Sequence, residues 1–467
     1  MQAKAGGEVE LQAKKGQGKA IIYILAFTLI ISVMSATMFN IVLPDIAEQY
    51  QLTVAQVSWV TSGYLLVYAV GTVIYGKLSD MYGLKSVLTF GFVLLALGSL
   101  FGLLAQTYWM VLLGRVIQAA GAAVIPAAAS IIPVRYYPEG QRGRALGIAM
   151  TGMSIGSALG PVVAAFVVSS LDWRWLFFMP ILTLITLPYY HRFLKEESGR
   201  RDKRIDWMGG GLLVGAAALL LLAITYETWI AGIASFVLFI LLLLRIRYTN
   251  EPFIPRGLTR NKGYSIGLTL AFLATGIGYS LNFLTPQLLN QVQQLDTALT
   301  GFVMMPAAAV AAILGRSGGK LADVKGVSFL FYSASAMLLI CFTLMSSFTE
   351  QSPVAIACFL ILGVVGQSFL YMALSNQISR TLAKEQIGVG MGLLAMSNFM
   401  AGAVTASLYG KIVDHGSGVQ WNPMIMEPKA FVYSNLYLVL GILYVCMLLI
   451  YRYKLDKTVS ARITDNS

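Results

Sequence analysis

The stretch Gly76-Lys-Leu-Ser-Asp-Met-Tyr-Gly83 returns 243 positions later as Gly319-Lys-Leu-Ala-Asp-Val-Lys-Gly326. Each copy follows a long apolar run and precedes another, so each is predicted to form a tight polar turn between two membrane-length helices. A chain that repeats one charged hairpin at this distance is predicted to consist of two related halves.

The composition predicts what kind of halves these are. Of the 467 residues, 57% are hydrophobic and only 12% are charged, and the mean hydropathy is +0.73. We therefore predict an all-α polytopic membrane protein. A spanning helix needs about 20 mostly apolar residues, and the sequence contains fourteen such runs. They are centred near Ile30, Val67, Leu95, Gln118, Ser157, Thr183, Ala217, Leu238, Ala274, Ala307, Ala336, Gly363, Phe399 and Gly441.

The distance between the two hairpins predicts how the spans are organised. Six helices with short loops occupy roughly 190 residues, so an offset of 243 leaves room for two inserted spans, near 208–226 and 229–245. The predicted fold is two six-helix bundles plus these two helices. The predicted parts are a cytoplasmic tail (1–19), an N-terminal bundle (20–195), a linker with the extra helices (196–262), a C-terminal bundle (263–453) and a second cytoplasmic tail (454–467).

The basic residues predict the orientation. If the N-terminal tail is cytoplasmic, the cytoplasmic segments hold all of the 33 Lys and Arg residues except Arg115, Arg174, Lys411 and Lys429. This bias predicts that both termini are cytoplasmic. It also explains the net charge of +12 without a nucleic-acid partner, because these loops face anionic lipid. We interpret the first apolar run as a retained helix, with a cleaved signal peptide as the alternative.

Several kinds of site lack their motifs. The three cysteines and two histidines form no metal-ligand spacing, and the sequence contains no phosphate-binding loop of the kind that serves ATP. The sequence predicts neither a soluble domain nor an acid cluster within the spans. It therefore does not support an enzyme or a sensor. We therefore predict no metal site, no cofactor and no catalytic residue.

The fourth span contains a buried charge, in Leu112-Leu-Gly-Arg115-Val-Ile-Gln118. An arginine inside a membrane helix is costly and faces the bundle interior or a wet cavity. Its spacing of three places Arg115 and Gln118 on one helix face. Two interpretations remain open: a structural arginine bonded to backbone carbonyls, or a residue for coupling or substrate binding.

The fifth span carries Gly152, Gly156 and Gly160 followed by Pro161. Glycines at this spacing form a flat stripe against which another helix packs closely, and the proline interrupts the backbone hydrogen bonds. The first span contains Ser35-Ala-Thr37-Met-Phe-Asn40-Ile-Val-Leu-Pro44, which places Ser35, Thr37 and Asn40 among apolar residues.

From about Ile21 to Tyr453 these elements resemble the major facilitator superfamily. The resemblance is to its fourteen-span drug:proton antiporters, above all the Gram-positive tetracycline and multidrug efflux transporters. The family's hairpin pattern, G-x-L-x-D-R-x-G-R-[RK], has its arginines replaced here by Met81 and Leu84. The family's aspartate in span one is replaced by Ser35. The resemblance implies a conformational role for Gly76, Asp80, Gly83, Lys85, Gly319, Asp323, Gly326, Gly152, Gly156, Gly160 and Pro161.

The resemblance further implies a secondary exporter in the plasma membrane of a bacterium. Its substrates would be amphipathic compounds such as drugs and tetracycline-like or lipid-like molecules, and protons would be the coupling ion. We expect a monomer that works by alternating access of its two halves. The alternative is an uncoupled or weakly coupled facilitator or exporter of an anionic amphiphile or metabolite.

The acidic residues leave the coupling site open. All 21 Asp and Glu residues fall on predicted loops or at outer rims, so none is expected in the membrane interior. Proton antiport needs a titratable group whose surroundings change with access. Asp45 could lie deeper than its hydropathy suggests, Asp80 or Asp323 could serve, or coupling could be weak or absent. Without an acid partner, Arg115 would attract an anionic substrate group.

Polar and aromatic residues at mid-span predict the rest of the pocket. Tyr64 with Tyr68, and Gln367 with Tyr371, are pairs at i and i+4 and therefore share a helix face. Aromatic walls with few hydrogen-bonding groups suit bulky amphipathic ligands, although ordinary helix packing would use the same residues. The predicted pocket comprises Tyr64, Tyr68, Tyr279, Asn282, Gln367, Tyr371 and Asn398.

Overall fold

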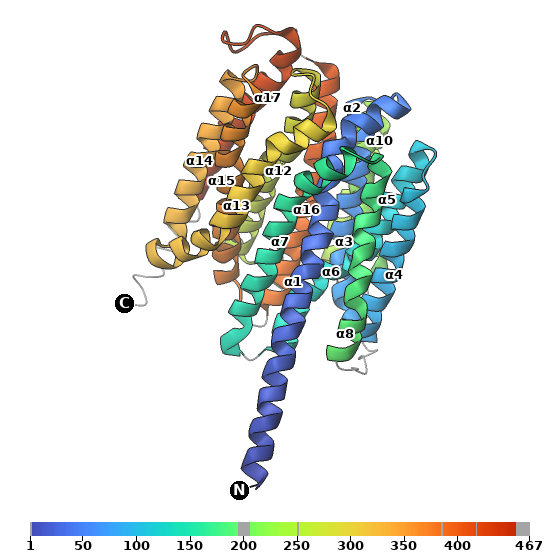
Figure 1. The fold of residues 1–467 in the computed structure, drawn as a ribbon, viewed down its shortest axis with the longest axis vertical. Helices are drawn as coiled ribbons and strands as arrows, with labels where there is room; N and C mark the ends of the chain where they lie inside the picture. Colours follow the sequence, from blue (N-terminus) through green and yellow to red (C-terminus); the bar gives the residue numbers. More distant parts are fainter. Residues whose placement is uncertain are drawn as a thin grey trace.

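A computed structural model describes residues 2–137, 139–194, 206–249, 252–383, 386–416 and 418–453. Helices account for nearly all of these residues (Figure 1). In the first half they are α1 (Gln2–Tyr50), α2 (Val54–Val57), α3 (Trp59–Tyr82), α4 (Leu84–Leu103), α5 (Tyr108–Ala122), α6 (Val124–Tyr136), α7 (Glu139–Val168), the 3-10 helix η1 (Trp173–Thr186) and α8 (Leu187–Phe193). They continue with α9 (Trp207–Tyr226), α10 (Trp229–Tyr248), α11 (Arg256–Thr259), α12 (Lys262–Gln291), α13 (Thr297–Lys325), α14 (Val327–Ser347), α15 (Pro353–Arg380), α16 (Ile387–His415) and α17 (Pro428–Tyr451).

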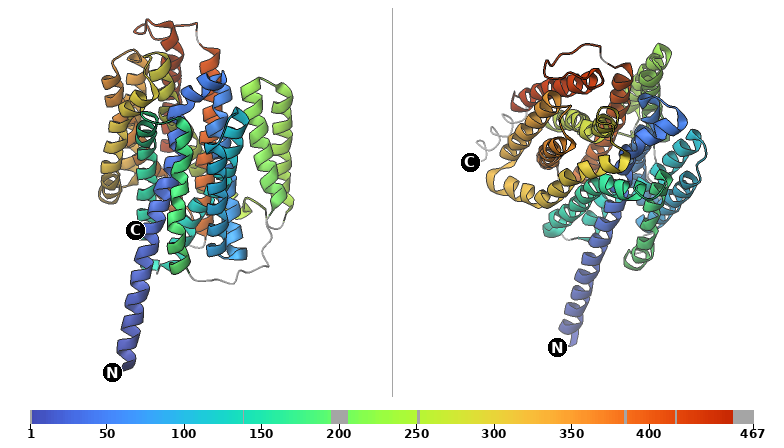
Figure 2. Two further views of the ribbon diagram at one scale, coloured as in Figure 1. Left: turned by 45° about the vertical axis from the view of Figure 1, so that its right-hand side comes forward. Right: turned by 45° about the horizontal axis from the view of Figure 1, so that its top comes forward.

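Two bundles lie side by side, as the repeated hairpin predicted. We call α1 to α8 the N-half and α12 to α17 the C-half. They meet along two seams, one between α7 and α13 and the other between α3 and α16 (Figures 1 and 2). We call the side at which α1 ends at Tyr50 the far side, at the top of Figure 1, and the opposite side the near side.

Within the described residues, thirteen helices are long and apolar enough to cross a membrane. The expected sixth span, centred near Thr183, has a different form. There η1 continues directly into α8, and this composite segment packs against α1 and α4. Pro180 and Pro188 each remove a backbone donor, which interrupts the α-helical hydrogen-bond pattern. The two bundles and the inserted pair are confirmed, but the sixth segment is no continuous α-helix.

The repeated hairpins have equivalent turns. Helix α3 ends at Tyr82 and α4 begins at Leu84, with Gly83 between them at φ 81°. In the C-half, Gly326 occupies the same place between α13 and α14 at φ 89°. A side chain is strained at such angles, so glycine is required at both turns. Asp80 and Lys85 flank the first turn on α3 and α4.

The other glycine of the first hairpin makes no close contact in this conformation. A Cβ built at Gly76 meets nothing within 4 Å, so the tight turn depends on Gly83. Gly319 and Asp323 lie in α13, but their side-chain surroundings fall outside the described residues.

The glycine stripe of α7 packs on the backbone of α1. A Cβ built at Gly152 would lie 2.6 Å from the carbonyl oxygen of Ala26, and one at Gly156 would lie 2.5 Å from that of Ile30. Gly160 lies against Thr37. These distances leave no room for a methyl group, so the predicted stripe is confirmed and its partner is α1.

The packing of α7 on α1 generates a prediction about stability. Replacing Gly156→Ala should destabilise the protein by about 1–3 kcal/mol, because the added methyl group forces two helix backbones apart. The matched control is Gly147→Ala on the same helix, where a Cβ meets nothing within 4 Å. Thermal unfolding of the purified protein in detergent measures both variants. Equal melting temperatures for the two variants would show that this contact does not limit stability.

Candidate functional site

Arg115 lies completely buried at the centre of the N-half. Its Nε donates to the carbonyl oxygen of Val60 at 3.2 Å, and its Nη1 donates to the carbonyl oxygen of Ser35 at 3.4 Å. Nη1 also donates to Gln118 Oε1 at 2.5 Å, and Gln118 Nε2 in turn donates to Ser99 Oγ at 2.8 Å. The expectation that Arg115 and Gln118 share a face is confirmed.

An aromatic column extends from this arginine to the C-half. The guanidinium lies 4.2 Å from the ring centroid of Phe39 and 3.8 Å from that of Tyr64. Tyr64 stacks on Tyr68 with centroids 5.6 Å apart, which confirms their shared face. Tyr68 contacts Phe399 of α16 edge-on at 4.6 Å. The column therefore connects the buried charge with the seam between α3 and α16.

This arrangement holds a charge without a carboxylate. Among the described residues no acid forms an ion pair with Arg115, whose Nη2 has no hydrogen-bond partner. A desolvated cation–π contact contributes about 2 kcal/mol, and a hydrogen bond to a charged group contributes about 1.5–3 kcal/mol. Two rings and three acceptors therefore offset much of the several kcal/mol that burial costs. In this conformation the arginine bonds backbone carbonyls, as the structural interpretation expected.

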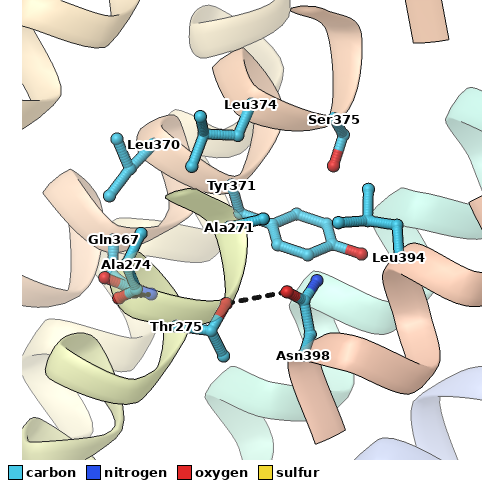
Figure 3. A pocket seen from close by; sticks show the side chains of 10 residues that line it. All are labelled: Ala271, Ala274, Thr275, Gln367, Leu370, Tyr371, Leu374, Ser375, Leu394 and Asn398. Atoms are coloured by element: carbon cyan, nitrogen blue, oxygen red, sulfur yellow. Dashed lines mark hydrogen bonds between the residues drawn. The ribbon is translucent and has the colours of Figure 1, made fainter. Parts of the chain in front are cut away.

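The C-half contains a second group of predicted residues, around Asn398. Thr275 Oγ1 donates to Asn398 Oδ1 at 3.0 Å, beside Gln367 and Tyr371 (Figure 3). They line a cavity of about 10 Å³, which is space for about one water molecule. The shared face of Gln367 and Tyr371 is thus confirmed. This polar group lies entirely within the C-half.

A larger cavity of about 70 Å³ lies between the halves at the seam of α7 and α13. This space is enough for several water molecules and narrow for a drug-sized ligand. Asn282 and Gln367 are the predicted residues that line it, and the Gln367 Oε1 atom has no hydrogen-bond partner. The remaining lining residues are Ser157, Ala158, Pro161, Gly278, Leu281, Met304, Ala308, Val364 and Ser368.

Of the predicted site residues, Asn40 and Tyr279 connect the two halves, whereas Thr37 faces away from the site. Asn40 Nδ2 donates to Tyr279 Oη, and Tyr279 Oη donates to Asn40 Oδ1, both at 3.3 Å across the middle of the protein. Thr37 instead bonds the carbonyls of Val33 and Met34 on its own helix and packs on α7. Thr37 therefore does not join the site, and Ser35 contributes only its backbone carbonyl.

The far side is closed by contacts that the sequence did not predict, although Asp45 was already a candidate acid. Asp414 of α16 accepts from the backbone nitrogens of Val54 at 2.7 Å and Ala55 at 2.6 Å, both in α2 of the opposite half. Thr297 of α13 donates to Asp45 of α1, again across the halves. Neither pair has a sequence signal, because each lies where an apolar run ends.

Comparison with known proteins places these features in a family. Residues 25–406 match the model of the Major Facilitator Superfamily. The riboflavin transporter RibZ of Clostridioides difficile is 25% identical over 74% of this chain and 77% of its own length. Multidrug resistance protein 3 of Bacillus subtilis is 28% identical over 67% of this chain and 63% of its own length.

A solved structure shows the same fold. A POT family transporter in complex with 5-aminolevulinic acid superposes with a TM-score of 0.70 at 14% identity, covering 95% of this chain and 96% of that one. The family match spans most of the chain and both bundles. This multi-pass membrane protein is therefore a transporter, and it belongs to the major facilitator superfamily.

Proposed function

We propose that the protein exports amphipathic small molecules across the plasma membrane of a bacterium by alternating access. One observation carries this proposal: the halves contact each other across the far side, and a cavity lies between them at the seam of α7 and α13. Rigid halves around a central site, closed on one side, are the geometry that alternating access requires. The multidrug relative supports export of amphipathic compounds.

The orientation follows from the distribution of basic residues. Lys77, Lys85, Arg192 and Lys325 lie at or beside near-side ends of helices, whereas Arg174 and Lys411 lie toward the far side. The positive-inside rule makes the near side cytoplasmic. We infer that both termini lie in the cytoplasm and that the described conformation is closed to the outside.

Proton exchange is the proposed coupling, and Asp45 is the acid that we propose for it. Coupling requires a carboxyl group whose surroundings differ between the two conformations. Asp45 is half-buried and receives its hydrogen bond from Thr297 of the opposite half. Opening of the far side would remove this partner and admit water, so the affinity of Asp45 for a proton would change with conformation.

The coupling proposal predicts proton movement. Purified protein in liposomes should release or take up protons when a transported substrate is added, and Asp45→Asn should reduce this signal at least tenfold. The control is Glu48→Gln, which removes an exposed acid one turn along α1. An undiminished proton signal with Asp45→Asn would exclude Asp45, and no signal in the unmodified protein would exclude antiport.

A second candidate concerns the charge of the substrate. The described helix interiors contain Arg115 as a buried cation and no carboxylate near it. In a medium of low dielectric constant this positive charge favours an anionic group and opposes a cation. We propose that the protein prefers anionic or zwitterionic amphiphiles. Because one relative is a riboflavin transporter, a metabolite is the alternative substrate.

The charge proposal predicts a selective effect of Arg115→Ala. Efflux of anionic compounds from a pump-deficient host should fall at least tenfold relative to efflux of cationic compounds of similar size. The control is Arg174→Ala, which removes an arginine paired with Asp172 at 3.1 Å on the far side. An equal loss for all compounds, together with a lowered melting temperature, would assign Arg115 to structure alone.

A further inference from the structure

The inserted helix α9 lies along one of the two seams between the halves. It packs on α3 of the N-half and on α16 of the C-half, whereas α10 packs on α9 (Figure 2). Only 11% of the most apolar part of α10 is buried, so α10 faces the lipid. Of the inserted pair, α9 is thus the helix placed to connect the two halves.

A hydrogen-bonded path runs through α9 near its far-side end. Trp59 of α3 donates from Nε1 to Thr225 Oγ1 at 3.0 Å, and Thr225 Oγ1 lies 3.2 Å from Ser407 Oγ of α16. Thr225 and Ser407 are both buried. One hydroxyl group of the inserted helix therefore joins an N-half side chain to a C-half side chain.

An ion pair lies at the end of the same path. Helix α9 stops at Glu227, which adopts a left-handed conformation with φ 53°. Its carboxylate lies 2.8 Å from Lys411 Nζ, one helical turn beyond Ser407 on α16. Hydrogen bonding and charge attraction from Lys411 lower the pKa of Glu227. The carboxylate therefore stays ionised at neutral pH.

We propose that Thr225 and Glu227 are positioning residues that hold the far side closed. This inference rests on the proposed alternating access. Opening the far side separates α2 and α3 from α16, and α9 cannot then stay bonded to both helices. At least one link in the path from Trp59 through Thr225 to Ser407 must break. The inserted helix thereby biases the equilibrium between closed and open conformations toward the closed one.

Reactivity of a buried reporter measures this bias. Ala55 is 1% exposed and lies behind Gly410 and Asp414 in the closed conformation. The full chain carries Ala55→Cys with the three native cysteines replaced by alanine, and the rate of modification by a membrane-impermeant maleimide is followed. Thr225→Val and Glu227→Gln should each raise this rate roughly two- to tenfold, since each removes one polar link.

Matched controls separate positioning from general damage. Thr228→Val removes a neighbouring hydroxyl group that makes no capping hydrogen bond. Glu427→Gln removes a far-side acid whose side chain also makes no capping hydrogen bond. Both should leave the rate unchanged. Exchange of the charges, Glu227→Lys with Lys411→Glu, should restore the slow rate. Rates equal to that of the parent protein, which carries only Ala55→Cys and the three cysteine replacements, for both Thr225→Val and Glu227→Gln would overturn the inference.

A further variant distinguishes failure of this inference from failure of alternating access. Asp414→Ala removes the contact that directly covers Ala55. If the reporter stays unreactive even then, the far side does not open, and both the inference and the proposed mechanism are wrong. If the reporter reacts in Asp414→Ala but not in the α9 variants, only the role of α9 is wrong.

Discussion

The carboxylate of Asp414 ties the two halves of this protein together on the far side. Asp414, at the end of α16, bonds two backbone nitrogens at the start of α2 in the opposite half. Free N–H groups at a helix start carry partial positive charge, so they suit an anion. The contact of Gly301 with Pro161 lies on the seam between α7 and α13, and Thr297 of α13 also bonds Asp45 of α1. These contacts hold the two halves together on the far side.

Much of the fold could be predicted because membranes constrain sequences strongly. Backbone groups must be bonded within each span, so apolar runs of about 20 residues predict helices. Glycines at Gly83, Gly152 and Gly156 predicted the turn and the close packing, since no other residue fits there. The sixth span departed from expectation because Pro180 and Pro188 alter its hydrogen bonding without changing its hydropathy.

The site was less predictable than the fold. Arg115 and Gln118 were evident because a buried charge and an amide three residues apart are rare in a span. Phe39 and Phe399, which complete the aromatic column, have no signal within apolar runs. Asp414 and Thr225 act through partners in distant segments, which a pattern in one segment does not reveal. The hairpin turns are equivalent in the two halves, whereas the buried arginine belongs to the N-half and the inserted helix to neither half.

Reciprocal motion of the two sides is the central claim, and distances between spin labels measure it most directly. One pair of labels at Gln51 and His415 reports on the far side, and another at Tyr82 and Lys325 reports on the near side; all four positions are exposed. On addition of a transported substrate in lipid nanodiscs, we predict that the far-side distance lengthens while the near-side distance shortens. Distances that both stay constant, or that lengthen together, would contradict alternating access in this protein.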